Sequence, residues 1–365
     1  MKILRNYLLK EFFKVLFIST ISLSFFYIIV DFISNMSAFT KHSPDFSYII
    51  LYFLLKSPEI IYRILPLSIL LSTMLVIISF NKNNEITAIK SSGVSMLKFT
   101  FPLMVAALGL SIFSFALSNF IAVKTNIERR IVMQKYINKN NNYSIKSIYK
   151  FKTRNIAIHY QKYIITAKAL NISKKQLTGL SIYKFNNKFK LIKRYNAETG
   201  YFSKGVLRLD NVIINHFNQK QPYSSFTKNI KVANLPIQLN INFFKSYDLK
   251  LEFLTIFNLF KMFNVAKKSG SNLSLIETFM YSKFAFPLIN LVLVLIGISI
   301  GIIVGKKSGT SAAIGISIIL AFGYWIINSI AISLGISSQL NPILAAFTAD
   351  IAFLFIAIYL ISDLD

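Results

Sequence analysis

The residues of this chain whose types and spacing could do chemistry lie in two polar groups within a largely apolar sequence. Residues 81–95 form a short polar segment with a single acid, Glu85, between two long apolar runs. Lys56, Glu59 and Arg63 have the spacing i, i+3 and i+7, so they share one face of a helix. A lone acid on a surface helix can bind a partner by charge, and a charged face can pair internally or bind an anion. Neither group by itself matches a catalytic motif.

The sequence lacks the motifs of common metal, nucleotide and nucleophile sites. His42, His159 and His216 are scattered, with no H-E-x-x-H spacing, and the chain has no cysteine. No G-x-S-x-G nucleophile elbow is present. Residues 305–308 resemble part of a phosphate loop, but Ile300 occupies the place of its first glycine, and the stretch ends an apolar run. We therefore expect no metal, no cofactor and no ATP binding by this chain itself.

The polar segment predicts a helix of two or three turns at a membrane surface. An asparagine at position 83 or 84 can cap it, and Glu85 then lies in the first turn, where a carboxylate suits the helix dipole. Two isoleucines follow three residues apart, Lys90 lies in the last turn, and Gly93 is suited to the C′ position. The alternative is a solvated loop with one helical turn.

The composition excludes an ordinary soluble protein. Hydrophobic residues make up 54% of the 365 residues and charged residues 15%, with a mean hydropathy of +0.54. The formal net charge of +27 has two explanations. Lys, Asn, Ile and Phe are abundant together, as an AT-rich genome produces without selection, or the charge serves contact with anionic lipid.

Six apolar runs are long enough to cross a bilayer, which takes about 20 residues. The first exceeds the apolar region of a signal peptide and lacks an Ala-x-Ala cleavage pattern, so we expect it to remain as a span. Asp31, near its far end, is an interfacial anchor or part of a polar pathway. The second run is too long for a straight span, and Pro58 and Pro66 are expected kinks. The expected spans are roughly residues 15–34, 48–80, 99–123, 279–304, 311–334 and 342–361.

The composition changes between the third and fourth spans. Short runs of alternating apolar and polar residues, separated by Gly, Asn and Asp, predict antiparallel strands such as residues 144–151, 155–160, 163–167, 180–185 and 205–209. A helix over residues 248–268 returns the chain to the bilayer. The predicted fold class is thus a membrane α-helical protein of six transmembrane helices with an inserted extracytoplasmic all-β domain, a sandwich or jelly roll. The predicted domains are residues 1–123, 124–275 and 276–365.

Charge places the termini and the polar segment on one side. Six spans put both termini together, and the short loops on that side hold most of the short-loop lysines, while the opposite loops hold little beyond Lys41. The positive-inside rule assigns the termini and Glu85 to the cytoplasm and the β domain to the outside, since long domains translocate regardless of charge. The lysines of the β domain then lie away from the cytoplasm, which argues against nucleic acid as a partner.

Small residues recur every four positions in the C-terminal half. The first stripe is Gly297, Gly301 and Gly305, and the second is Gly309, Ala313, Ser317 and Ala321. Such stripes let helices approach closely, and we expect a helix-packing role for them.

Several segments resemble one family, the lipopolysaccharide-export permeases LptF/LptG. The similarity covers nearly the whole chain and is most specific at residues 84–95 and between residues 283 and 325, with further similarity over residues 160–217. In that family the segment matching residues 84–95 docks into a groove on a cytoplasmic ATPase, and the acid at the place of Glu85 contacts it. The candidate coupling residues are therefore Glu85, Ile86, Ile89, Lys90 and Gly93.

The resemblance also implies partners and a path. Two related permeases, LptF and LptG, work with two copies of the ATPase LptB and a membrane-anchored LptC to extract lipopolysaccharide. The lipid enters through gates formed by the first and fifth spans and leaves through the apolar inside of the jelly roll. The run Val30–Phe32 looks more like LptG than LptF. A lysine that LptG members can carry in the first span has no counterpart near Ile28. The candidate lipid-contact residues are Asp31, Lys41, Lys56, Glu59 and Arg63, the last three being alternatively an ion-paired ladder at the outer interface.

Other classes of protein remain open. A membrane receptor would need a cytoplasmic output domain, yet the cytoplasmic loops are short. A lipid-modifying enzyme would need convergent ionisable groups within the spans, and only Asp31 and the set from Lys56 to Arg63 qualify. A permease for another lipid or a lipoprotein is also compatible with the sequence.

Overall fold

The computed structural model divides into a helical unit, Met1–Asn138 with Glu277–Asp365, and a second unit, Lys139–Ile276. The helical unit therefore extends to Asn138, past the expected boundary at residue 123, because residues 124–137 continue the third long helix. The residues that the structure describes are 2–139, 156–160, 162–171, 176–186, 189–203, 206–217, 225–237, 251, 254–268, 272–305 and 310–362.

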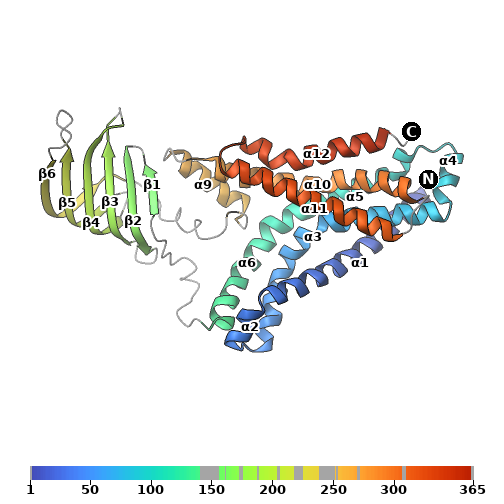
Figure 1. Ribbon diagram of the computed structural model, residues 1–365, viewed down its shortest axis with the longest axis horizontal. Coiled ribbons are helices and arrows are strands. Elements are labelled where there is room, and N and C mark those ends of the chain that lie inside the picture. The colour runs from blue at the N-terminus through green and yellow to red at the C-terminus, as the bar shows by residue number, and fades with distance from the viewer. Residues whose placement is uncertain are drawn as a thin grey trace. The chain divides into compact units, whose positions relative to one another are not determined.

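The helical unit contains the six expected spans. Among the described residues, six helices are long and apolar enough to cross a membrane. The first turn of α1, the last turn of α12 and the short helix α4 lie at the same end of this unit (Figure 1). The elements are α1 (Lys2–Ser34), α2 (Met36–His42), α3 (Phe46–Lys82), α4 (Glu85–Ser91), α5 (Met96–Ala116), η1 (Leu117–Ile121), α6 (Ala122–Ile131), η2 (Val132–Ile137), α10 (Ser274–Gly305), α11 (Thr310–Ile336) and α12 (Pro342–Ser362).

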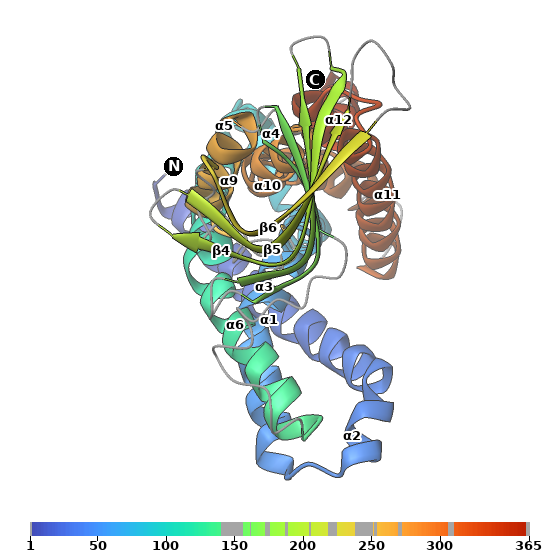
Figure 2. The ribbon, with the colours of Figure 1, turned by 90° about the vertical axis from the view of Figure 1, so that its left-hand side faces the viewer.

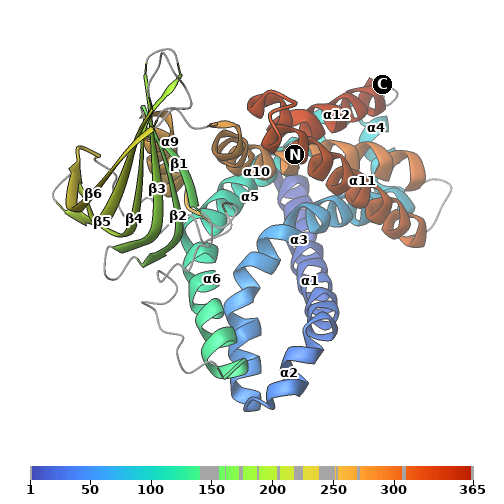
Figure 3. The same ribbon diagram turned by 60° about the vertical axis from the view of Figure 1, so that its left-hand side comes forward.

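Two segments differ from expectation. The outer loop is largely helical, as α2, and Phe39 from it is buried with Tyr52, Val132 and Ile137. Helix α5 does not end at residue 123 but continues through η1, α6 and η2, two of which are π-helical turns. Residues 117–137 are too polar to be recognised as a span from the sequence, yet they pack along α3. Helices α1, α3 and α6 together form one arm of the helical unit (Figure 3). Pro58 and Pro66 lie inside a helix that is assigned without interruption.

The first small-residue stripe packs against α3. A Cβ atom added to Gly297 would lie 2.9 Å from Thr73 Cβ, and one added to Gly301 would lie 2.8 Å from Ile77 Cβ. One turn on, Asn81 Nδ2 donates to the carbonyl of Ile302 at 3.0 Å. The helix-packing role predicted for this stripe is thus seen at two of its three glycines. Gly305 is the last residue of α10.

The second stripe also packs inward where it is described. Ala313 and Ser317 are fully buried, and Ser317 Oγ lies 3.1 Å from Met74 Sδ of α3. Gly309, the first member of this stripe, lies outside the described residues. Helix α3 is therefore the central element, with α10 and α11 packed on it through small side chains.

We expect Gly301→Ala to destabilise the helical unit by about 1–3 kcal/mol, because the new methyl group would overlap the branched Cβ of Ile77. The measurement is the unfolding midpoint of the purified chain in mild detergent titrated with a denaturing detergent. Gly315→Ala on α11 is the matched control, since no atom lies within 4 Å of the added Cβ. The control should only gain the helix propensity of alanine, about 1 kcal/mol at most. Equal midpoints for the two variants would contradict close packing at Gly301.

The second unit contains a six-stranded antiparallel sheet with the strands in chain order. The expected all-β domain is confirmed, and the described strands form one bent sheet rather than two separate ones (Figure 2). The strand expected at residues 144–151 lies outside the described residues. The elements are β1 (Ile156–Tyr160), β2 (Tyr163–Asn171), β3 (Gln176–Phe185), β4 (Leu191–Ser203), β5 (Val206–Phe217), β6 (Ser225–Leu235) and the helix α9 (Ile256–Lys268).

One face of the sheet is apolar and buried. Ile165, Leu180, Ile182 and Leu209 are at most 2% exposed and belong to one core cluster. Side chains of alternating residues point to the opposite, solvated face, as expected for an antiparallel sheet with one packed side.

Candidate functional site

Helix α4 ends in a Schellman motif. The N–H of Gly93 donates to the carbonyl of Lys90 at 3.0 Å, and the N–H of Val94 donates to that of Ile89 at 3.4 Å. Gly93 has φ +76°, a left-handed conformation that a side chain would strain. The predicted C′ role of this glycine is confirmed, and its left-handed conformation ends the helix.

The beginning of α4 is less regular. Asn84 is the N-cap residue, with φ 58°, and its side chain makes no capping hydrogen bond. The side chain of Asn83 instead donates to Glu85 Oε1 at 3.3 Å. The carboxylate is therefore held over the first turn of the helix, where the dipole favours a negative charge.

The apolar side of α4 faces the helical unit. Ile86 and Ile89 are 2% and 6% exposed and belong to a buried cluster with Phe80 of α3 and Phe99 of α5. Leu8 of α1 belongs to the same cluster. The two isoleucines were grouped with the partner-contacting residues, but their burial gives them an anchoring role. Lys90, Gly93 and the partly exposed Glu85 remain on the outer side.

A second polar group joins three helices within the arm formed by α1, α3 and α6. Lys56 Nζ of α3 pairs with Asp31 Oδ1 of α1 at 2.5 Å. Glu59 pairs with Arg63 through Oε1 and Nε at 2.9 Å, and with Arg129 of α6 through Oε2 and Nη2 at 3.5 Å. Three cations thus face two carboxylates, so this charged cluster carries one net positive charge.

Aromatic and amide groups surround the charged cluster. The ammonium of Lys56 lies 5.6 Å from the ring centre of Tyr27 and 5.8 Å from that of Tyr52. Arg129 donates to the Tyr52 hydroxyl at 3.3 Å and to Asn126 Oδ1 at 3.0 Å. Lys56 and Glu59 are nearly inaccessible, whereas about a third of the Arg63 side chain is exposed (37%). The cluster therefore holds α1 and α6 against α3 and presents one guanidinium to the outside.

Part of this cluster is evident in the sequence. Lys56, Glu59 and Arg63 were expected to pair with one another. Glu59 and Arg63 do pair, but Lys56 pairs with Asp31 of another helix. Arg129 was missed because residues 124–137 were assigned to the β domain, although Asn126 and Arg129 have helical i, i+3 spacing. Lys41 is exposed on α2, and among the described residues it has no acid partner within ion-pair distance.

The C-terminal half contains further buried polar residues that were not predicted from the sequence. Tyr324 of α11 donates to Asp350 Oδ1 of α12 at 3.0 Å, and Asp350 is 8% exposed. Lys283 and Asn290 of α10 are likewise buried. The expectation that Asp31 and the set from Lys56 to Arg63 are the only ionisable groups within the spans was therefore wrong. The signal was present, since Asp350 interrupts the last apolar run.

The three histidines belong to different elements. His42 ends α2, His159 is in β1 and His216 is in β5. Slight burial and the charges of Lys193 and Lys228 lower the pKa of His216. Within the described ranges, no group of three or more His, Asp or Glu side chains is arranged to hold a metal ion.

Comparison with known proteins gives one finding that covers the chain. A family described as "Lipopolysaccharide export system permease LptF/LptG" matches residues 6–363. No curated protein matches the chain closely enough to be reported as a relative.

Proposed function

Because this chain belongs to the LptF/LptG family of lipopolysaccharide export permeases, we propose that it is the permease subunit of an ATP-driven exporter. In this proposal it extracts lipopolysaccharide from the inner membrane and passes it to a periplasmic bridge. The chain is a multi-pass membrane protein and a transporter subunit rather than a catalyst. ATP hydrolysis is then the work of a cytoplasmic partner of the LptB type.

The observation that carries the proposal is the construction of α4. This helix is seven residues long, is closed by a Schellman motif and is anchored by two buried isoleucines. It lies at the same end of the helical unit as the two chain ends (Figure 1), and positive-inside counting assigns that end to the cytoplasm. A short helix held in this way keeps Glu85 and Lys90 in fixed positions for contact with a partner in the cytoplasm, where ATP is available.

The packing beneath α4 supports transmission of a movement into the spans. The buried cluster that holds Ile86 and Ile89 includes residues of α1, α3, α5 and α10. Since packed side chains transmit displacement between rigid elements, a push on α4 would tilt these helices together. We propose that ATP-driven movement of α4 narrows a lipid-binding cavity by this route.

The exposure of the spans supports a lipid path along α1 and α11. Most of α3 and α10 is buried within the chain, whereas most of α1 and α11 is exposed. These two helices are the first and fifth spans, which the family resemblance identifies as lateral gates. We propose that a second permease of the LptF type faces them across the cavity, with an LptC-type protein at the membrane.

The charged cluster supplies candidate contacts for lipid phosphates. Lys56 places its ammonium beside Tyr27 and Asp31 of α1, close in sequence to Ile28, where LptG members can carry a lysine. Arg63 is the cation of the cluster whose side chain is most exposed to the surroundings. We propose that Arg63 meets the anionic lipid and that Lys56 positions α1, with Lys41 as a separate surface contact. The run Val30–Phe32 favours LptG over LptF for this chain.

Affinity purification of the tagged chain in mild detergent, followed by mass spectrometry of the bound proteins, tests this function. We expect an ABC-type ATPase and a second six-span permease to be recovered, together with bound lipopolysaccharide. Recovery of the ATPase with another lipid or a lipoprotein would keep the transport class and change the cargo. Recovery of the chain alone at every detergent strength would overturn coupled transport.

A further inference from the structure

Strand pairing in the β sheet is interrupted along one line. One residue in each of five neighbouring strands is unpaired in the ladder although the register is the same on both sides of it, namely Lys168, Gly179, Glu198, Asn211 and Lys231. We call this line the crease. The alternation of buried and exposed residues shifts by one position there, since in β5 Leu207 and Leu209 are buried on one side of it and Val212 and Ile214 on the other.

The crease has special backbone conformations. Gly179 has φ +63° and Asn211 has φ +52°, both in the left-handed region. A Cβ added to Gly179 would lie 2.8 Å from Lys168 Cδ, so the side chain of Lys168 crosses directly over the glycine. The change in the alternation of buried and exposed residues keeps one face of the bent sheet apolar on both sides of the crease. It also turns the crease residues to the solvated face, as bulges do.

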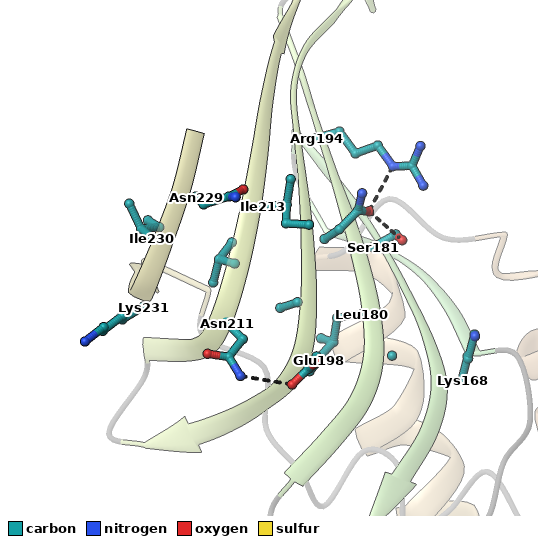
Figure 4. Close-up of a pocket in the computed structure, with 14 residues that line it drawn as sticks. Lys168, Leu180, Ser181, Arg194, Glu198, Asn211, Ile213, Asn229, Ile230 and Lys231 are labelled. Carbon is teal, nitrogen blue, oxygen red and sulfur yellow. Dashed lines mark hydrogen bonds between the residues drawn. The ribbon is translucent and has the colours of Figure 1, made fainter. Parts of the chain in front are cut away.

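A pocket of about 750 Å³ lies along the crease (Figure 4). This volume is in the range of ligand sites, roughly 300–1,000 Å³. The pocket is lined by four exposed polar side chains, Lys168, Glu198, Asn211 and Lys231, and by the partly buried Arg194 and Asn196.

Two sets of hydrogen bonds orient these groups (Figure 4). Asn196 Oδ1 accepts from Ser181 Oγ and from Arg194 Nε, each at 2.9 Å. Asn211 Nδ2 donates to Glu198 Oε2 at 2.9 Å. The first set uses the acceptor oxygen of the Asn196 amide and leaves its two N–H groups and the outer guanidinium nitrogens of Arg194 as donors. Among the described residues, Lys168 and Lys231 have no acid partner within ion-pair distance.

The crease pocket is cationic and rich in hydrogen-bond donors, and it contains one carboxylate. Three cations stand against one carboxylate, so the pocket carries two net positive charges. Ammonium and guanidinium groups are suited to phosphate oxygens, and amides with a carboxylate are suited to sugar hydroxyls. A bare phosphate would be repelled by Glu198, whereas a sugar phosphate can place a hydroxyl there and its phosphate on the lysines.

We propose that the crease pocket binds a phosphorylated saccharide, the sugar portion of the exported glycolipid. The choice of glycolipid as its source rests on the proposed function, while the ligand class rests on the pocket itself. A ligand bound here would lie over the apolar core of the unit, because Leu180, Ala197 and Val212 line the pocket and also belong to the buried cluster. The β unit would then guide the polar head of the cargo through water.

The test is calorimetric titration of the full chain in lipid nanodiscs with a defined probe, the oligosaccharide of lipopolysaccharide freed of acyl chains but retaining its phosphates. The double variant Lys168→Glu/Lys231→Glu should bind at least about tenfold more weakly, because two attractive charge contacts become repulsive. Lys193→Glu/Lys228→Glu is the matched control, since it makes the same charge change in the same sheet outside the pocket. We expect the control to bind the probe within about twofold of the unmodified chain, since only screened, longer-range electrostatics change. In this control the pKa of His216 should also rise, which shows that the surface charges have changed.

Four results would overturn the proposal. One is that the probe binds no form of the chain. Another is that both double variants bind the probe with the affinity of the unmodified chain. The same oligosaccharide stripped of phosphate could bind equally well, which would remove the role of the cations. A poly-glutamate peptide could compete as effectively as the probe, which would point to an acidic protein surface instead. Recovery of the ATPase is measured in a separate experiment. A negative result for saccharide binding at the crease pocket would therefore not contradict the proposed function as an exporter subunit.

Discussion

Replacement of Glu85 by lysine is expected to lower the ATPase activity of the assembled exporter by about tenfold or more while the chain stays inserted. Glu85 is the only acid on α4, and its carboxylate lies on the partly exposed side of a helix that two buried isoleucines hold in place. Reversal of its charge therefore changes the surface that we propose for docking and leaves the two anchoring isoleucines in place. A loss of 1.4 kcal/mol at such a contact is about a tenfold effect. ATP hydrolysis by the complex in nanodiscs and lipid export in cells measure it.

Asp45→Lys is the control for this prediction. Asp45 is exposed at the N-terminal end of α3, and its side chain makes no capping bond, so the substitution makes the same charge change away from α4. We expect that variant to hydrolyse ATP at the normal rate. Full activity of the Glu85→Lys exporter would remove Glu85 from the coupling mechanism, whereas a chain lost from the membrane would show that α4 is needed for folding.

Lys56→Met is expected to destabilise the helical unit by about 3–5 kcal/mol, the usual cost of leaving one partner of a buried ion pair uncompensated. Lys56 is 7% exposed, and its ammonium pairs with Asp31 across two helices while lying beside two tyrosine rings. The variant would therefore loosen α1 from α3. The measurement is unfolding of the purified chain in mild detergent, with the level of inserted protein as a second readout.

The double variant Asp31→Asn/Lys56→Met separates a lost pair from lost packing. It should recover part of the stability, because no charge is left unpaired, and the non-additivity measures the coupling between the two residues. Lys41→Met provides the baseline, since Lys41 is exposed and is expected to change stability by less than about 0.5 kcal/mol. Additive losses in the double variant would contradict a direct role for the pair.

Much of the fold could be predicted from local pattern. A bilayer span needs a long apolar run, and each of the six runs corresponds to a helix of the structure. The end of α4 was predictable because only glycine readily takes the conformation at Gly93. The glycines at 297 and 301 were predictable as contacts because their spacing places them on one helix face. These features depend on residues close to one another in the chain.

Pairing between helices was not predictable in the same way. The spacing of Lys56, Glu59 and Arg63 shows which residues share a face, but it contains no information on what the neighbouring helix presents to that face. The structure places Asp31 of α1 against Lys56 and Arg129 of α6 against Glu59. The boundary at residue 123 was wrong for a related reason, since the polar half of the third helix is stabilised by its packing on α3 rather than by its own composition.

The sequence by itself determined six spans, an inserted β unit, and the short polar helix α4 with its single acid, because length, periodicity and capping are local properties. Only the tertiary structure decided that Ile86 and Ile89 anchor that helix, that Arg129 completes the charged cluster, and that strand pairing is interrupted in five strands along one crease. Each of these depends on distances between side chains far apart in the chain, and such distances are set by packing of the whole unit.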